Sequence, residues 1–318
     1  MSFDFDAAVV APFRMQPGLR RLAPHARHLN PSAPGSRHQR EKLAVLSAFA
    51  HEALAAREGF DAAPAVAALA ARAAAEHPGH FAWNGGHAAA LGVQVPADGR
   101  LVHEMRAGVF GLGDEIGRCL RALPPRWRLA GLLSLAFEED FALLDGRDGT
   151  VPWLAVALPS HWAPEEKVGL HFRGVHAPVA DNERLIAAGE SLPLLVSGPA
   201  AHERFVWSLG THPRLHAHPR RSWREPWPVG DPDAVAQAAW WRTERQTFLP
   251  LSGSACAPGA LFTIGVQVRP LVQALAGPAQ AQRLHDALAS MSPAVLAYRG
   301  LAEARDDLLA WLARRARA

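Results

Sequence analysis

The order of strand-like and helix-like segments constrains the fold of this chain more than any other feature. An apolar stretch over 141–144, the turn-rich residues 145–149 and a second apolar stretch over 151–158 predict a β-hairpin. Further strands are predicted over 203–209, 240–249 and 260–268. Helical signals lie between the hairpin and these strands, and others flank both ends of the chain. Two strands, a helical middle and three strands make an α+β order.

The segments around these strands show no linker long enough to separate two domains, so we predict a single domain over 1–318. Its predicted parts are an extended arm (1–40), a helical N-terminal part (41–135), a sheet core (136–270) and C-terminal helices (271–318). Within these parts, helices are expected over 40–57, 64–76, 182–188 and 271–289, with Asp181 as the cap of the third, and residues 77–100 are expected to be irregular.

The charge balance excludes several classes of protein. Lys and Arg number 33 against 30 Asp and Glu, which gives a formal charge of +3. A balance this close to neutral is not typical of a protein whose surface binds nucleic acid.

The N-terminus is acidic and has no apolar run after it, so a signal peptide is not expected. The longest uncharged stretch, 247–268, is interrupted by prolines and glycines and is read as two strands instead of a membrane span. A cytoplasmic protein without membrane contact is therefore predicted.

The two cysteines limit the cofactors that this chain can hold. Cys119 and Cys256 cannot form a disulfide framework, a zinc knuckle or a four-thiolate iron–sulfur site. Each is expected to be a small buried apolar residue with a reduced thiol.

Several motifs were tested and rejected. The glycines of 111–117 resemble a dinucleotide fingerprint, but the third glycine is one position late and no clear strand precedes it. Three histidines within 212–218 are flanked by arginines and prolines, so a solvated loop is expected there instead of a metal site. The acidic run 138–140 is expected to be a solvated strand entry.

One histidine stands out from the 16 in the chain. His176 lies between Val175 and Ala177-Pro178, and an apolar setting would keep its imidazole neutral and able to coordinate a metal. On the residues alone, a hydrogen-bonded histidine of the core remains an open alternative. Downstream, the period of two places Arg242 and Gln246 on one strand face and Arg245 on the other. Arginines on a strand that lines a cavity suit carboxylate or propionate groups.

Ordered blocks along the whole chain resemble the haem-binding alpha subunit family of haem-dependent oxidative N-demethylases, a family formerly known as a domain of unknown function. The blocks are Ala11-Pro12-Phe13-Arg14-Met15-Gln16-Pro17-Gly18-Leu19-Arg20, Glu139-Asp140-Phe141, the run from Pro159 to Gly169, Val175-His176-Ala177-Pro178-Val179, the run from Arg242 to Thr247, and Leu261-Phe262-Thr263-Ile264.

The resemblance implies a PAS-like antiparallel five-stranded sheet that encloses a haem b, with extra N- and C-terminal helices. By the matching motifs, His176 becomes the axial iron ligand. The other residues implied near the haem are Arg204, Arg242, Arg245 and Gln246, with Glu166 and Trp207 as catalytic candidates. The family usually has Arg-x-Asn-Trp on the first of the last three strands, and here Val206 takes the place of the Asn. The distal pocket is therefore expected to depart from the family pattern.

The activity implied is oxidative demethylation of a small secondary amine such as dimethylamine, with O₂ and electrons from NADPH, giving formaldehyde and the smaller amine. Since two cysteines cannot hold a [2Fe–2S] cluster, those electrons must come from a separate reductase subunit. By resemblance, that partner carries FMN and [2Fe–2S], and a further subunit binds tetrahydrofolate. The alternative is a non-catalytic haem-binding PAS-like sensor of gas or redox state.

Overall fold

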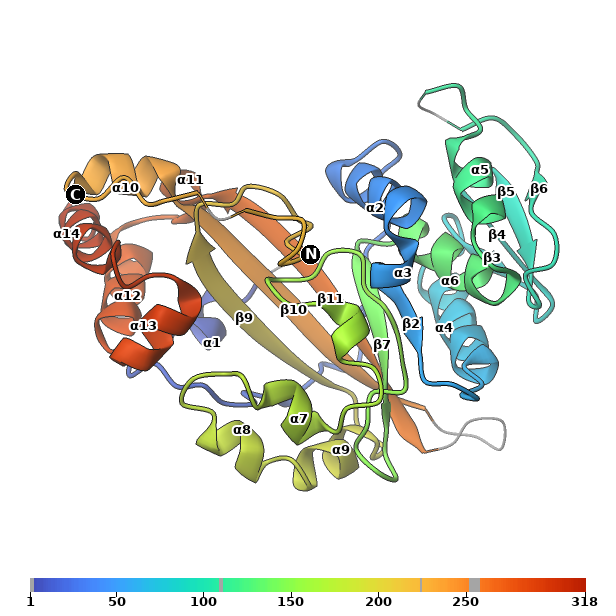
Figure 1. Cartoon of the computed structure of the whole chain (residues 1–318), viewed down its shortest axis with the longest axis horizontal. Coiled ribbons are helices and arrows are strands. Elements are labelled where there is room, and N and C mark those ends of the chain that lie inside the picture. The colour runs from blue at the N-terminus through green and yellow to red at the C-terminus, as the bar shows by residue number, and fades with distance from the viewer. Residues whose placement is uncertain (1–2, 109–110, 224, 252–257) are drawn as a thin grey trace.

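An α+β architecture with two antiparallel sheets is present in the computed structural model, which describes residues 3–108, 111–223, 225–251 and 258–318 (Figure 1). Cys256 lies outside the described residues. The larger sheet has seven strands, all paired antiparallel. In spatial order they are β1 (Arg20–Arg21), β9 (His202–Gly210), β10 (Trp240–Leu251), β11 (Gly259–Pro270), β7 (Glu139–Asp145), β8 (Trp153–Ala155) and β2 (Leu54–Ala56).

The five strands expected from the sequence form the centre of this sheet, but the expected number of strands is wrong. Two short strands extend the edges: β1 pairs with β9 through Arg20 and Glu203, and β2 pairs with β8 through Leu54 and Ala155. Strands of two and three residues are too short to show an alternating pattern, so sequence periodicity could not reveal them.

The irregular stretch expected at 77–100 is also wrong, because it holds most of a second, four-stranded sheet. Its strands are β3 (Ala82–Trp83), β4 (His87–Ala90), β5 (Val93–Pro96) and β6 (His103–Glu104), in that order. A two-residue turn joins β4 and β5, and Gly92 in it has a φ of 81°. A Cβ added at Gly92 would lie 2.6 Å from the Arg106 carbonyl oxygen, so this turn requires glycine.

Most helices lie in three groups around the large sheet. The first group is α2 (Arg37–Ala48), α3 (Ala50–Ala53), α4 (Ala63–Glu76), α5 (Glu115–Ala122) and α6 (Pro125–Ala136). The second is the 3₁₀ helix η1 (Pro164–Glu166) with α7 (Phe172–His176), α8 (Glu183–Ala187) and α9 (Ser191–Val196). The third is α10 (Pro232–Ala238), α11 (Leu271–Ala274), α12 (Pro278–Ala289), α13 (Pro293–Arg299) and α14 (Arg305–Arg315), and α1 (Phe5–Ala8) stands alone in the arm.

Two predicted helices are broken, each for a local reason. The helix expected over 40–57 ends at Ala48, resumes for one turn as α3 and then becomes strand β2. The helix expected over 271–289 is interrupted by the Gly277-Pro278 pair, because proline at the start of α12 cannot continue a helix from before it. Asp181 does not cap α8, since it has a φ of 50° and accepts a hydrogen bond from Ser292 Oγ at 2.6 Å.

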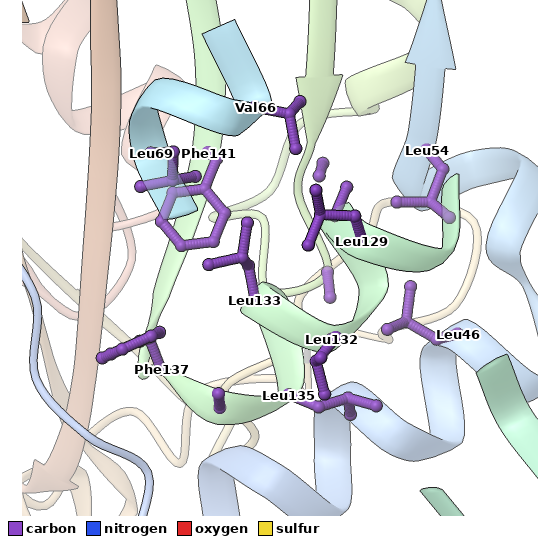
Figure 2. Close-up of a cluster of buried hydrophobic side chains, with 14 of the residues drawn as sticks. Leu46, Leu54, Val66, Leu69, Leu129, Leu132, Leu133, Leu135, Phe137 and Phe141 are labelled. Atoms are coloured by element: carbon purple, nitrogen blue, oxygen red, sulfur yellow. The ribbon is translucent and has the colours of Figure 1, made fainter. Parts of the chain in front are cut away.

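The main hydrophobic core fixes the N-terminal helices to the sheet (Figure 2). Helix α6 is buried on nearly every side from Leu129 to Ala136, which is the pattern of a helix inside a core. It packs against Leu46 of α2, Leu69 of α4 and Phe141 of β7. Each such leucine contributes roughly 1.5–3 kcal/mol by burial. Cys119 is buried near this core, as expected.

Polar residues at the entry of β7 are buried, so the solvated strand entry expected at 138–140 is wrong. Lys42 and Asp140 are both fully buried and form an ion pair at 3.1 Å. Lys42 Nζ also donates to the carbonyl oxygens of Phe137 and Glu139, at 3.1 and 2.5 Å, and Asp140 Oδ2 accepts from the Leu158 backbone N–H at 2.7 Å. The network fixes α2, β7 and the segment after β8 together.

A second core lies at the other end of the sheet, where the C-terminal helices pack on β9 and β10 (Figure 1). Its members include Trp207, Trp241, Leu284 and Leu308. These side chains occupy one face of the two strands, so the other face is available to the helices α7 to α9. Among the described residues, we find no helix with both the length and the apolar character needed to span a membrane.

Candidate functional site

A cavity of about 480 Å³ lies between the large sheet and the segment that carries η1, α7 and α9. Its wall is mostly apolar, with Leu144, Phe172, Leu192, Phe248, Phe262 and Ile264 among its residues. The polar residues that line it are Ser160, His161, Glu166, Lys167, His176, Arg204, Glu244, Gln246 and Tyr298. A concave, mainly apolar space of this size with a few polar groups is typical of a site for a small molecule or cofactor.

Helix α7 ends at His176, and hydrogen bonds from side chains stabilise both of its ends. The side chain of His171 caps the helix by accepting a hydrogen bond from the Arg173 backbone N–H at 3.1 Å. After the helix, Asn182 Nδ2 donates to the carbonyl oxygens of His176 and Ala177, at 3.1 and 3.0 Å. These contacts hold a helix of five residues, which would not be stable alone.

The imidazole of His176 is neutral, and its Nε2 has no hydrogen-bond partner among the described residues. Its Nδ1 lies 2.9 Å from the carbonyl oxygen of Phe172, and because a carbonyl only accepts, the proton is assigned to Nδ1. Burial lowers the pKa of His176 to about 4, against an opposing effect of the Phe172 hydrogen bond, and the charges of Arg204 and Lys167 lower it further. A neutral imidazole with Nδ1 fixed by a carbonyl is the usual form of a metal-ligating histidine.

Two cations face the cavity without a protein partner. Among the residues that the structure describes, no acceptor lies within hydrogen-bond distance of the Arg204 guanidinium or the Lys167 ammonium group. Burial lowers the pKa of Arg204, opposed by the charge of Glu244. Both side chains are half-buried, and because an unpaired charge that is partly removed from water is costly, they fit a ligand that carries anionic groups.

Three predicted site residues lie elsewhere or are already occupied. Arg242 is buried, and its guanidinium donates to Ser160 Oγ at 2.6 Å and to the carbonyl oxygens of four residues, Leu158, Pro159, Arg214 and Leu215. Arg245 points to the opposite face of β10 and donates to Glu203 Oε2 at 2.9 Å. Trp207 is not part of the cavity wall.

The Trp207 indole stacks on Trp241 at a centroid distance of 5.1 Å in the C-terminal core, and its N–H donates to the Ala8 carbonyl oxygen at 3.0 Å. Its position follows from alternation, since Arg204 and Trp207 are three residues apart on one strand and must face opposite sides. Val206, at the position of the family's Asn, pairs in register with Glu244.

Four predicted residues do share the cavity, namely His176, Arg204, Gln246 and Glu166. Glu166 is exposed at the rim, whereas Gln246 is half-buried and donates to Glu244 Oε2 at 2.6 Å.

Sequence reasoning missed Glu244, Lys167, Ser160 and His161 as cavity residues. The alternation that places Arg242 and Gln246 on one face also places Glu244 there, so the signal for this residue was present. Lys167 and Ser160 belong to a loop segment, where no period indicates which way a side chain points.

The prediction of a solvated loop over 212–218 is wrong at His218, the last histidine of the segment. His218 is buried and its Nε2 lies 3.2 Å from Glu165 Oε2 on η1. Next to it, Arg220 pairs with Glu165, and Arg221 pairs with Glu52 of α3 at 2.7 Å. The loop therefore fastens η1, which forms part of the cavity wall. Within the described residues, no group of three or more His, Cys, Asp or Glu side chains could hold a metal ion.

The fold and the cavity define an α+β protein that can hold a largely apolar, anionic ligand beside the neutral imidazole of His176. A family model described as haem-dependent oxidative N-demethylase, alpha subunit-like, matches residues 119–309. The match covers more than half of the 318 residues, so this chain belongs to that family. The resemblance drawn from the sequence motifs is confirmed, and it places the chain in a haem-dependent oxidoreductase family whose name indicates a multi-subunit system.

The residues of the cavity fit a haem. Haem iron can be held by one protein nitrogen because the porphyrin itself supplies four more, and His176 would offer such a nitrogen. The apolar wall suits the porphyrin faces, and the unpaired Arg204 and Lys167 suit its propionates. All three residues lie within the matched range.

Proposed function

We propose that this protein is the haem b-bearing catalytic subunit of an oxidative N-demethylase that acts on a small secondary amine of the dimethylamine type. The observation that carries the proposal is the neutral imidazole of His176 in the wall of a cavity that also contains two unpaired cations. In this proposal His176 ligates the iron, and Arg204 and Lys167 hold the propionates. The finer fold assignment, a PAS-like core, is supported by the adjacent antiparallel strands β9, β10, β11, β7 and β8 with helices between β8 and β9.

Haem, when bound, would supply O₂ binding and electron transfer. The protein does the rest. Phe172 fixes the His176 tautomer through its carbonyl oxygen, so Nε2 remains unprotonated for the metal. The aromatic pair Phe248 and Phe262, stacked at 4.5 Å between centroids, keeps the sheet side of the cavity apolar and limits water. Gln246 and Glu244 form the polar part of that side.

Reducing power has to come from another subunit. Cys119 is buried, and burial raises the pKa of its thiol, so it does not act as a thiolate ligand on the surface. Two cysteines in the chain cannot hold a [2Fe–2S] cluster. The proposal therefore includes an NADPH-dependent partner with FMN and [2Fe–2S], a further subunit that captures formaldehyde on tetrahydrofolate, and a cytoplasmic location where NADPH is supplied.

The proposal is tested by a formaldehyde assay. The haem-loaded protein, a cognate reductase, NADPH and a panel of methylated amines are combined in air, and formaldehyde is measured over time. We expect formaldehyde with at least one secondary methylamine, and none with His176→Ala. The surface variant His51→Ala serves as the matched control and should keep full activity. Haem uptake without formaldehyde from any amine would overturn the demethylase proposal and favour the sensor.

A further inference from the structure

One carboxylate in the cavity wall is buried and has no role in the proposal so far. Glu244 is 8% exposed and lies on β10, on the same face as Gln246 and Phe248. Among the described residues of the wall, the other carboxylate is Glu166, which is exposed at the rim. Glu244 is therefore the negative charge within the cavity itself.

The groups bonded to Glu244 all donate to it. Ser160 Oγ donates to Oε1, and Gln246 Nε2 donates to Oε2 at 2.6 Å. Arg242 Nε in turn donates to Ser160 Oγ at 2.6 Å, so the hydroxyl proton of Ser160 is directed to the carboxylate. A carboxylate has about four lone-pair sites, and two of them are used by these donors. Glu244 thus has a fixed orientation and can still accept hydrogen bonds from a ligand.

The neighbouring strand leaves those sites open. Val206 pairs with Glu244 in the β9–β10 register and has no polar atom in its side chain. Arg204 and Glu244 are not within ion-pair distance, since no salt bridge joins them among the described residues.

We propose that Glu244 binds the ammonium group of the amine substrate and accepts its proton. This inference rests on the proposed function and adds to it the residue that recognises the substrate. Aliphatic amines have pKa values near that of lysine, about 10, so the substrate arrives as a cation with two N–H donors. A cation that enters a cavity with Arg204 and Lys167 needs a counter-charge, and Glu244 provides it.

The proton step balances without a further reactant. One N–H bond of the dialkylammonium ion breaks, an O–H bond forms on Glu244, and the electron pair stays on nitrogen. The products are the neutral amine and the protonated carboxyl group. Only the neutral amine has a lone pair that can be oxidised, so the step prepares the substrate for the reaction.

Calorimetric titration of the haem-loaded protein at about pH 7.5 tests the assignment. Dimethylamine hydrochloride is the cationic probe, and 2-propanol is a neutral probe of similar size. We expect Glu244→Gln to weaken dimethylamine binding by roughly 10- to 100-fold, because a charged hydrogen bond is lost, and to leave 2-propanol binding within about twofold. The surface variant Glu58→Gln, away from the cavity, is the matched control and should bind both probes as the wild type does.

Equal losses of affinity for both probes would overturn the assignment, because they would show that Glu244 only maintains the structure of the cavity. An unchanged dimethylamine affinity would also overturn it, because the carboxylate would then not contact the substrate. Should Glu244→Gln fail to fold, Glu244→Asp keeps the charge and moves it, and we expect a selective loss for dimethylamine of a few-fold, about 3 to 10; an unchanged ratio between the probes would contradict us. A wild-type protein that takes up no haem refutes the proposed function as well, whereas haem uptake with unaltered amine affinity in Glu244→Gln refutes only the role of Glu244.

Discussion

Arg242 and Arg204 lie on neighbouring strands and face the same side of the sheet, yet their surroundings differ completely. Arg242 donates to a serine hydroxyl and four carbonyl oxygens, so it ties the segment after β8 and the loop at 214–215 to the sheet. Arg204 donates to no acceptor among the described residues and faces the cavity. The first arginine is part of the scaffold, and the second is available to a ligand. The identity of a residue in a motif therefore does not decide its role; the acceptors around it do.

The largest effect is expected from Arg242→Met. This change leaves five acceptors without their donor, three of them in buried hydrogen bonds, so we expect a loss of about 3–5 kcal/mol in the free energy of unfolding in urea. Arg118→Met is the control, because Arg118 forms an exposed ion pair with Asp114, and it should cost less than about 1 kcal/mol. Similar unfolding free energies for the two variants would show that the hydrogen bonds of Arg242 do not stabilise the fold.

The second effect concerns pH and His176. The pKa of His176 is about 4 in the folded protein and about 6.5 in the unfolded chain. As the pH falls from 6.5 toward 4, the unfolded chain therefore binds a proton at His176 that the folded protein does not bind. Stability is thereby lost toward acid, by about 2 kcal/mol between about pH 7 and pH 5.

Urea unfolding of the haem-free protein at both pH values measures this loss. His176→Leu should be less sensitive to acid by that amount, while the surface variant His51→Leu should follow the wild type. An equal acid sensitivity in His176→Leu would show that His176 is not a buried neutral imidazole.

The third prediction concerns Arg204. Because this guanidinium has no acceptor in the described part of the chain, Arg204→Met should leave the unfolding free energy of the haem-free protein unchanged or raise it by up to about 1 kcal/mol. Haem affinity should fall by about 10-fold through the loss of a propionate partner. Both are measured on one preparation, by urea unfolding and by haem titration. A strongly destabilised Arg204→Met protein would place Arg204 in the same class as Arg242.

The smallest effect is expected from Trp207→Phe. The indole N–H loses its bond to the Ala8 carbonyl oxygen, which costs about 1 kcal/mol of unfolding free energy. The visible spectrum with haem should not change, since Trp207 packs in the C-terminal core. A shifted Soret band in this variant would contradict this placement and show that Trp207 affects the haem.

The sequence allowed the central strands of the sheet and the cavity position of His176 to be predicted, because apolar alternation and motif matches carry that information. It did not reveal β1 and β2, which form by pairing with the edge strands β9 and β8. The sequence also assigned Arg242 and Arg204 the same role near the haem. A motif identifies the arginine, but it does not show that the carbonyl oxygens of residues 158, 159, 214 and 215, from distant segments, already accept hydrogen bonds from Arg242. The burial of Asp140 likewise depends on Lys42, about a hundred positions away in the chain.

The central claim is that the cavity between the sheet and α7 binds haem through His176. Its most direct test is the visible spectrum of the purified protein, ferric and dithionite-reduced, during titration with haem, compared with that of His176→Ala. We predict equimolar uptake with a Soret band that shifts on reduction, and a displaced Soret band with an affinity lower by roughly 100-fold or more in the variant. A wild-type protein without a Soret band, or a variant with the wild-type spectrum and affinity, would contradict the claim.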